Sequence, residues 1–283
     1  PHIGHLAALA HRDVIGKDPG MDLRGATVLV TGATGGIGRA LAGALARHGA
    51  QLVLTGRRTD VLEPLAERLG GRAIAADLAD RGAAERLLDE TGRVDVLVAN
   101  AALPASGPLD DYSITEIDRA LDVNLRAPIV MAKIAGAQMA ERGRGHLVFV
   151  SSLAGRTASA HASLYNATKF GLRGFALALR EDLRPHGVGV STVFPGFIRD
   201  AGMFADAGVT LPRGIGTRTS QDVARATVRA IEKNIAEVDV APLGLRLGAR
   251  LGGVAPVLSA AVQRRAGGLR VAQDLAKGQR GKR

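Results

Sequence analysis

A glycine-rich turn near the start of the chain stands between a β-branched apolar run and a helical pattern. Residues 26–30 favour a strand, residues 31–38 contain the turn, and residues 39–48 show helical apolar spacing. Within the turn, Gly32 permits a tight bend, Gly36 lets backbone amides approach an anion, and Gly38 allows close packing of the helix. The unit predicts a strand, a turn and a helix that together hold a phosphate at the helix amino terminus.

Further strand patterns alternate with helical ones along the chain. Strands are expected at residues 26–30, 51–55, 72–76, 94–98, 146–150, 187–194 and 237–241. This alternation predicts an α/β fold with a doubly wound, mostly parallel, seven-stranded Rossmann-like sheet and helices on both faces. With 283 residues and 46% apolar content, the chain can bury this core as a single domain. Residues 115–140 are expected to form one long helix, kinked at Pro128.

The residues after the second strand distinguish two dinucleotide cofactors. A fold selective for NAD usually carries an acid there that bonds the ribose 2′-hydroxyl, whereas a cation accommodates the 2′-phosphate of NADP. Here Gly56 is followed by Arg57 and Arg58. An arginine fork can hold a phosphate through two hydrogen bonds. The sequence therefore favours NADP(H) over NAD, with Arg57 as the main ligand and Arg58 as the second; two solvated turn arginines are the alternative.

Three polar residues near the middle of the chain have a spacing that suits acid–base chemistry. Tyr165 and Lys169 are four residues apart, so a helix places them on one face, and Ser152 precedes Tyr165 by thirteen residues. Ser152 follows the apolar run 146–150, which puts its hydroxyl at the carboxyl end of a strand, where open α/β sheets bind ligands. A neighbouring Lys169 cation is expected to lower the pKa of the Tyr165 phenol towards the working pH. An ordinary helix with a half-buried tyrosine and a solvated lysine is the alternative.

Together, the turn and the three polar residues resemble the short-chain dehydrogenase/reductase family, with the resemblance running over residues 23–242. It places Ser152, Tyr165 and Lys169 on the family's catalytic positions, and it implies that Tyr165 and Lys169 also contact the cofactor. The spacing Gly32-x-x-x-Gly36-x-Gly38 is similar to the family's turn, which implies cofactor contacts at Gly32, Thr34, Gly36, Ile37 and Gly38.

The resemblance also implies roles for residues that follow later strands. Asp77 and Leu78 match positions that line the adenine, although Asp77 could equally cap the helix expected to start near Asp80. Asn100 matches a cofactor position, whereas Ala99 and Ala102 depart from the family's pattern there.

Three more positions are implied in the same way. Pro195 and Gly196 match the end of the strand at the cofactor, but Ile198, Arg199 and Asp200 stand where the family often has a threonine. Asn124 in the long helix matches a residue that holds a water for relaying protons to Lys169. A bond from Asn124 to its preceding turn is the alternative.

The implied function is an NADP(H)-dependent oxidoreductase that interconverts a carbonyl and a secondary alcohol, with Tyr165 as general acid and base. Residues 197–211 read as an apolar lid, which favours an apolar substrate; a surface helix explains them equally well. A 3-oxoacyl-carrier-protein reductase is one alternative, and a non-catalytic dinucleotide-binding scaffold or sensor is another. The family resemblance further implies a homodimer or homotetramer.

Composition excludes several classes of protein. The chain has no cysteine, which excludes disulfides and thiolate metal sites, and no metal is expected. No apolar run approaches the roughly 18 residues of a membrane-spanning helix. Residues 1–20, with His2, His5 and His11, read as an extension outside the fold rather than as a metal site. A cytoplasmic protein is expected, with a catalytic domain at residues 21–242.

The net charge of +10 is concentrated in residues 243–283, which carry nine arginines and lysines against one acid, Asp274. Few aromatic residues accompany them, so nucleic acid is not expected as a partner. Leucines interspersed with the basic residues suggest a peripheral contact with an anionic membrane. The alternative is a helix packed on the domain and a solvated basic end, because Gly252, Gly253 and Pro256 interrupt the pattern. Residues from Ala266 onward are expected to be disordered.

Overall fold

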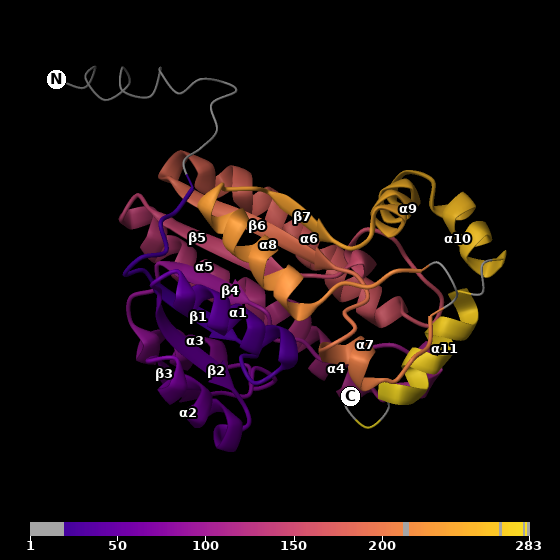
Figure 1. Ribbon diagram of the computed structural model, residues 1–283, viewed down its shortest axis with the longest axis horizontal. Coiled ribbons are helices and arrows are strands. Elements are labelled where there is room, and N and C mark those ends of the chain that lie inside the picture. The colour runs from indigo at the N-terminus through magenta and orange to yellow at the C-terminus, as the bar shows by residue number, and fades with distance from the viewer. Residues whose placement is uncertain (1–19, 212–214, 266–267, 280, 282–283) are drawn as a thin grey trace.

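The computed structural model describes residues 20–211, 215–265, 268–279 and 281, and its core is one sheet of seven parallel strands (Figure 1). The strand order is β3-β2-β1-β4-β5-β6-β7. The strands are β1 (Thr27–Thr31), β2 (Gln51–Gly56), β3 (Arg72–Ala75), β4 (Val96–Ala99), β5 (Gly145–Val150), β6 (Val188–Pro195) and β7 (Glu237–Val240). The predicted fold class is confirmed.

The strand sequences explain why this sheet is parallel and central. β1, β4, β5 and β6 are almost entirely buried and rich in valine and leucine, as expected for strands covered on both faces. In the register, Leu29 pairs with Val53 of β2 on one side and with Leu97 of β4 on the other. Because the chain reverses its direction of growth at β1, the carboxyl ends of β1 and β4 form the switch point at which such sheets bind ligands.

Helices cover both faces of the sheet (Figure 1). The core on one face includes residues of α1 (Gly36–Arg47), α2 (Thr59–Arg68) and α8 (Ser220–Glu232). The core on the other includes residues of α3 (Ala83–Thr91), α5 (Ala127–Glu141) and α6 (Ser163–Leu183). The first described residues join the first layer, since the N–H of Met21 donates to the carbonyl of Ile231 in α8 at 3.1 Å. The predicted extension at residues 1–20 lies, except for Gly20, outside the described residues.

The expected long helix at residues 115–140 is interrupted in a way that the sequence did not predict. It consists of α4 (Ile114–Leu121), a π-helical turn (Asp122–Arg126) and α5. The irregularity therefore lies before Pro128, at the turn that contains Asn124. Pro128 has no N–H, so it cannot give the carbonyl of Asn124 its α-helical hydrogen bond. π turns of this kind are frequent at functional sites.

Three helices follow the sheet and lie beyond its carboxyl edge (Figure 1): α9 (Leu243–Val254), α10 (Pro256–Arg265) and α11 (Gly268–Gln279). The expectation of disorder from Ala266 onward is wrong for residues 268–279, since α11 contacts α7 (Gly202–Asp206). Ala272 and Ala276 of α11 are buried, which the sequence alone did not indicate. No helix in the described part of the chain is long and apolar enough to cross a bilayer.

Candidate active site

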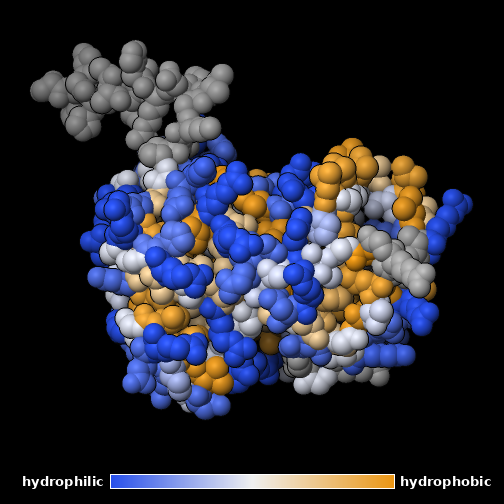
Figure 2. Space-filling model, in the orientation of Figure 1, coloured by the Kyte–Doolittle hydropathy of each residue, from blue (hydrophilic) through white to orange (hydrophobic). Residues whose placement is uncertain are grey.

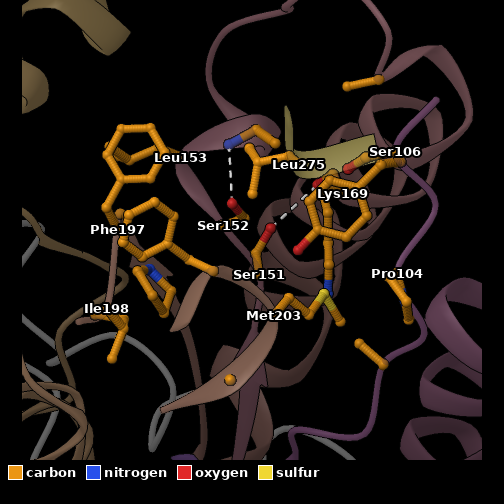
Figure 3. A pocket seen from close by; sticks show the side chains of 18 of the residues that line it. Pro104, Ser106, Ser151, Ser152, Leu153, Lys169, Phe197, Ile198, Met203 and Leu275 are labelled. Atoms are coloured by element: carbon orange, nitrogen blue, oxygen red, sulfur yellow. Dashed lines mark hydrogen bonds between the residues drawn. The ribbon is translucent and has the colours of Figure 1, made fainter. Parts of the chain in front are cut away.

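Ser152 stands at the carboxyl end of β5, where the chain enters a 3-10 turn, η4 (Leu153–Gly155). Its Oγ accepts a hydrogen bond from the N–H of Ala154 at 3.1 Å, and the residue lines a large cavity (Figure 3). The turn packs tightly on α6, because a Cβ on Gly155 would lie 2.7 Å from the carbonyl oxygen of Lys169. Glycine at position 155 thus sets how closely Ser152 approaches α6.

Tyr165 and Lys169 lie on the first turns of α6 and line the same cavity. The Nζ of Lys169 is 5.6 Å from the centroid of the Tyr165 ring and donates to the carbonyl of Val150 at 3.2 Å. The structure therefore brings Ser152, Tyr165 and Lys169 to one wall of the cavity. Their catalytic roles remain a prediction.

Burial is the main cause of the pKa shifts of Tyr165 and Lys169. Burial raises the pKa of Tyr165 to about 12, and a hydrogen bond with Ser152 opposes that rise. Burial also lowers the pKa of Lys169 to about 8. The pKa of the Tyr165 phenol is thus raised, whereas the sequence analysis expected Lys169 to lower it. The loss of hydration on burial outweighs the opposing effect of the hydrogen bond with Ser152. Lys169 still carries its proton at neutral pH.

Asn124 is buried in the π turn and does not line the cavity. Its Oδ1 accepts from the N–H of Leu103 at 2.7 Å, and its Nδ2 donates to the carbonyl of Leu103 at 2.9 Å. Its side chain therefore bonds the loop after β4, rather than the preceding helical turn. The proposed water relay remains a prediction, and it would have to use the main chain of Asn124.

The glycine turn suits the diphosphate of a dinucleotide. α1 begins at Gly36 with no side chain capping its first N–H groups and no acid in its first turn, so these donors are available to an anion. Gly32 has a φ of 65°, which other residues adopt only with strain. A Cβ on Gly38 would lie 2.1 Å from the carbonyl oxygen of Gly32, so only glycine lets the helix close on the turn.

Gly36 lies close to the segment just before α7, a contact that the sequence did not predict. A Cβ at Gly36 would lie 2.3 Å from the Cβ of Ala201, just before α7. A Cβ at the next residue, Gly202, would lie 3.4 Å from the Cδ1 of Ile37, which is ordinary van der Waals contact. The segment between β6 and α7 therefore packs over the glycine turn, and movement of this segment would open or close the space beside Gly36.

Arginine side chains line the part of the cavity where the resemblance implies the adenosine of the cofactor. Arg57 and Arg58 line it as expected, and Arg39 in the first turn of α1 is a third cation that the sequence analysis missed. Arg58 donates to the carbonyl of Thr34 at 2.7 Å, which fixes its guanidinium against the turn. Arg57 is half-exposed and only 4.0 Å from Asp77, a weak pairing that a phosphate could replace.

Asp77 does not cap the following helix. α3 begins at Ala83 after Gly82, and Asp80 rather than Asp77 accepts the N–H of Gly82. Asp77 instead bonds the N–H of Ala79 and lines the cavity, which is compatible with the adenine position implied by the resemblance. The remaining predicted cofactor residues also line this cavity: Thr34, Leu78, Asn100, Pro195 and Gly196.

Asn100 holds the switch point together. Its Nδ2 donates to the carbonyl of Thr31 at 2.9 Å, and its N–H donates to the Oγ1 of Thr31 at 3.0 Å. These bonds join the carboxyl ends of β1 and β4. The departures at Ala99 and Ala102 therefore leave the cross-strand contact intact.

The cavity continues beyond Ser152 into an apolar chamber of which the sequence revealed only part. The whole cavity has a volume of about 1260 Å³. Phe197, Ile198 and Met203 of the expected lid line it, and α11 contributes Leu275 (Figure 3). Further apolar residues come from the helices after the sheet: Leu245, Leu251, Leu258, Val262 and Val271. No strand or turn motif marks these helices as part of a site, so sequence reasoning missed them.

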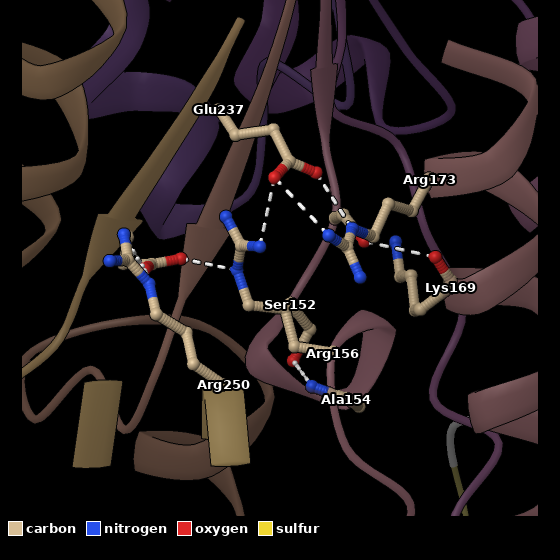
Figure 4. A network of polar contacts seen from close by, with 9 residues as sticks. Ser152, Ala154, Arg156, Lys169, Arg173, Glu237 and Arg250 are labelled. Atoms are coloured by element: carbon tan, nitrogen blue, oxygen red, sulfur yellow. Dashed lines mark hydrogen bonds and ion pairs between the residues drawn. The ribbon is translucent and has the colours of Figure 1, made fainter. Parts of the chain in front are cut away.

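A buried ionic network ties the Ser152 loop to the last strand and to α9 (Figure 4). Arg156 donates to Asp239 at 2.5 Å and to Glu237 at 2.9 Å, and Arg173 of α6 also binds Glu237. Burial would raise the pKa of Glu237, but the hydrogen bonds and charges of the two arginines outweigh it and lower that pKa below its usual value. On the other side, Arg250 of α9 is 3.0 Å from Asp239.

Groups of histidine, aspartate and glutamate that could hold a metal are absent from the described residues. His2, His5 and His11, which the sequence analysis considered as a metal site, lie outside the described residues.

Comparisons with known proteins point to one family. Residues 26–211 match the family described as short chain dehydrogenase. Ketoacyl reductase HetN of Nostoc sp. is 36% identical over 227 residues, which cover 77% of this chain and 79% of that protein. A short-chain dehydrogenase from Sphingobium yanoikuyae in complex with NADPH superimposes with a TM-score of 0.72 at 28% identity, covering 83% of this chain and 95% of that one.

A metagenomic short-chain oxidoreductase in complex with NADP has a TM-score of 0.64 at 34% identity, covering 78% of this chain and 99% of that one. The sheet, the glycine turn and these similarities lead to one conclusion. The chain belongs to the short-chain dehydrogenase/reductase family of oxidoreductases.

Proposed function

We propose that the protein is an NADP(H)-dependent oxidoreductase that interconverts an apolar ketone and its secondary alcohol. The observation that carries the proposal is one cavity lined by the glycine turn, by Arg57 and Arg58, and by Ser152, Tyr165 and Lys169. Structural neighbours that contain NADPH or NADP support the cofactor preference. Residues 21–242 would be the catalytic domain, and the helices within residues 243–283 would complete the substrate chamber.

The three polar residues can divide the work of carbonyl reduction. Bound NADPH would supply the hydride. Ser152 would donate a hydrogen bond to the substrate oxygen, where a preorganised donor contributes about 3 kcal/mol to transition-state stabilisation. Tyr165 would give its proton to the developing alkoxide; its raised pKa keeps it protonated at neutral pH, as a general acid requires. Lys169, charged and buried beside the ring, would hold the cofactor ribose and lower the cost of forming phenolate.

The π turn supports a role for Asn124 in resupplying that proton. Pro128 cannot donate to the main-chain carbonyl of Asn124. The side-chain amide of Asn124 is already hydrogen-bonded to the main chain of Leu103. A main-chain carbonyl without its helical donor is a natural acceptor for water. We infer a water between this carbonyl and Lys169.

The lining of the chamber favours substrates with a large hydrocarbon part. Beyond Ser152, its walls include phenylalanine, methionine, leucine and valine side chains, with polar ones such as Ser259 and Gln263 among them. Burying an apolar substrate there would yield about 25 cal/mol for each Å² removed from water. A 3-oxoacyl thioester is the second candidate, and similarity to ketoacyl reductase HetN favours it.

The exposed side of α6 supports a homodimer or homotetramer. Phe170 and Leu177 are exposed there and share the surface with small residues, Gly171, Gly174 and Ala178. A smooth apolar helix face of this kind suits packing against a second copy. We further propose that the enzyme acts in the cytoplasm, consistent with the lack of cysteine.

The replacement Tyr165→Phe tests the assignment. Turnover of NADPH with a panel of apolar ketones and 3-oxoacyl thioesters should fall by at least about a hundredfold, because general acid catalysis is lost. The dissociation constant for NADPH should stay within about twofold, since the replacement removes only the proton donor and keeps the ring.

The chain's other tyrosine provides a matched control. Tyr112 donates to the carbonyl of Ser106 at 3.0 Å and does not line the cavity, so Tyr112→Phe should keep its activity. Retention of more than about a tenth of the activity in Tyr165→Phe would rule out Tyr165 as the proton donor. NADPH binding with no turnover of any ketone or thioester by the unaltered protein would favour the scaffold alternative.

A further inference from the structure

The outer sides of α9 and α10 expose a continuous set of large apolar side chains. On α9, the spacing of four and three residues places Leu243, Leu247, Leu251 and Val254 along one stripe. Val257, Leu258 and Val262 continue it on α10, and these seven side chains are between 51% and 86% exposed. We call these seven residues the apolar face. Figure 2 shows apolar surface gathered over α9 and α10.

The apolar face is exceptional among the described residues. Large apolar side chains that are exposed elsewhere are few and scattered over several elements: Leu109, Ile114, Phe170, Leu177 and Leu269. Burying the seven residues of the face would remove far more apolar surface from water than burying any of those singly. A surface of this size needs a partner.

Charge on the same two helices identifies the partner's chemistry. Residues 243–265 contain four arginines and no acid. Arg264 and Arg265 are exposed at the end of α10, whereas Arg250 is already paired with Asp239. Leucine and valine flanked by arginines that have no ion pair within the described part of the chain complement a surface that is apolar inside and anionic outside, which is the composition of an anionic lipid bilayer.

The two helices are held with this face outward. A Cβ on Gly252 would lie 2.2 Å from Thr157, so α9 sits directly on the segment after Ser152. Gln263 of α10 donates to the carbonyl of Ala158 at 3.1 Å. At 12 and 10 residues, α9 and α10 are too short to cross the hydrocarbon core, so they can only lie in the plane of the membrane surface.

The apolar face is also continuous with the cavity. Leu251, Leu258 and Val262 belong to the face and line the cavity at the same time. We propose that the protein binds the surface of an anionic lipid bilayer through this face, with α9 and α10 lying in the headgroup layer and the chamber opening towards the lipid. Binding would not depend on the proposed reaction, since no residue of the Ser152, Tyr165 and Lys169 wall takes part in it.

Co-sedimentation with vesicles tests the proposal on the full chain. Binding to phosphatidylglycerol-containing vesicles should be clear at low salt, weaker at high salt, and weak on phosphatidylcholine alone. Leu247→Glu combined with Val257→Glu should lower the affinity at least about tenfold, because both side chains would insert and neither lines the cavity. The control pair Leu109→Glu and Ile114→Glu, similarly exposed but on other elements of the fold, should bind as the unaltered protein does.

The charge contribution has its own matched pair. Arg264→Ala with Arg265→Ala should weaken binding to anionic vesicles and reduce its salt dependence, whereas Arg47→Ala with Arg68→Ala, on α1 and α2, should change neither. Unchanged melting temperatures and unchanged NADPH affinity establish that the variants are folded; Leu247→Ser with Val257→Ser replaces the glutamate pair if it unfolds.

Two results would overturn the proposal. One is full-length protein that stays in the supernatant with anionic vesicles at low salt. The other is a Leu247 and Val257 variant that binds vesicles normally but loses a dimer in light scattering, since the face would then cover a second copy. Both are read without any turnover, so they stand apart from success or failure of the proposed reaction.

Discussion

At the scale of single residues, Arg57 is the group best placed to distinguish NADPH from NADH. Its guanidinium is half-exposed at the cavity rim and meets Asp77 only at 4.0 Å. Arg58 is partly committed to the carbonyl of Thr34. An incoming 2′-phosphate would therefore find Arg57 free to rotate towards it, without breaking a strong bond.

Replacing Arg57 with alanine should weaken NADPH binding by about tenfold to a hundredfold and leave NADH binding nearly unchanged, because the phosphate that the side chain would contact exists only on NADPH. Dissociation constants for both cofactors, measured by fluorescence titration, provide the check. Arg68→Ala, an exposed arginine on α2, is the control and should alter neither constant. An equal loss for both cofactors after the Arg57 change would show that Arg57 does not read the phosphate.

Sequence could indicate residues whose role depends on local spacing, and could not indicate those whose role depends on distant partners. Tyr165 and Lys169 are one helical turn apart, so their common face follows from the α-helix itself. Arg156 gives no such signal, because its partners Glu237 and Asp239 lie on a strand more than 80 residues away. The opposite direction of the Tyr165 pKa has the same origin, since burial is a property of the packed molecule.

At the scale of elements, the link between β7 and α9 should control the apolar chamber. Asp239 is fully buried between Arg156 and Arg250. Arg250→Ala removes only the outer arginine, so the inner pair remains and the sheet should stay folded. α9 would lose an anchor, and we expect faster proteolysis of residues 243–279 and a KM for large apolar ketones raised several-fold, with kcat for a small ketone little changed.

Limited proteolysis followed by mass spectrometry, together with kinetics on a large and a small ketone, measures both effects. The control is Arg246→Ala, one turn earlier on α9, whose loss leaves the pair of Arg250 and Asp239 in place. Equal cleavage rates for the Arg250 variant and the unaltered protein would mean that packing alone holds α9.

The elements also differ in how far sequence could predict them. Strands buried on both faces are continuous apolar runs, so all seven were found within a few residues of their observed ends. The sequence did not predict the π turn at residues 122–126, because helical propensity does not distinguish a hydrogen bond to the fifth residue along the chain from one to the fourth. The sequence predicts a disordered end where α11 forms, since the burial of its Ala272 and Ala276 and its contact with α7 depend on tertiary packing.

At the scale of the whole molecule, a buried histidine should make the fold sensitive to acid. His146 of β5 lies 2.8 Å from the Oγ of Ser191, and burial, assisted by the charge of Arg180, lowers its pKa to about 3. Between about pH 6.5 and pH 3, the unfolded chain binds a proton that the folded chain excludes. The free energy of unfolding should therefore fall with decreasing pH over this window, by up to about 1.4 kcal/mol per pH unit from this residue.

Urea unfolding at a series of pH values measures that slope. His146→Gln should flatten it whatever its effect on stability at pH 8, because glutamine does not titrate. His186→Gln, at an exposed position after α6, should leave the slope unchanged. If both variants retained the slope of the unaltered protein, carboxylates rather than His146 would account for the acid sensitivity.

The pairing of Arg156 with Asp239 has a consequence for how the protein is made. A ribosome releases β1 to β5 and the Ser152 loop long before β7, yet 83 residues separate the two ends of this ion pair. Until β7 emerges, the buried arginine has no carboxylate, and its desolvation opposes docking of the loop that carries Ser152. A polypeptide released before residue 237 would thus carry the glycine turn and Ser152 but lack the carboxylates that bind Arg156. Interrupted translation is therefore expected to leave the loop of Ser152 without its anchor on the last strand.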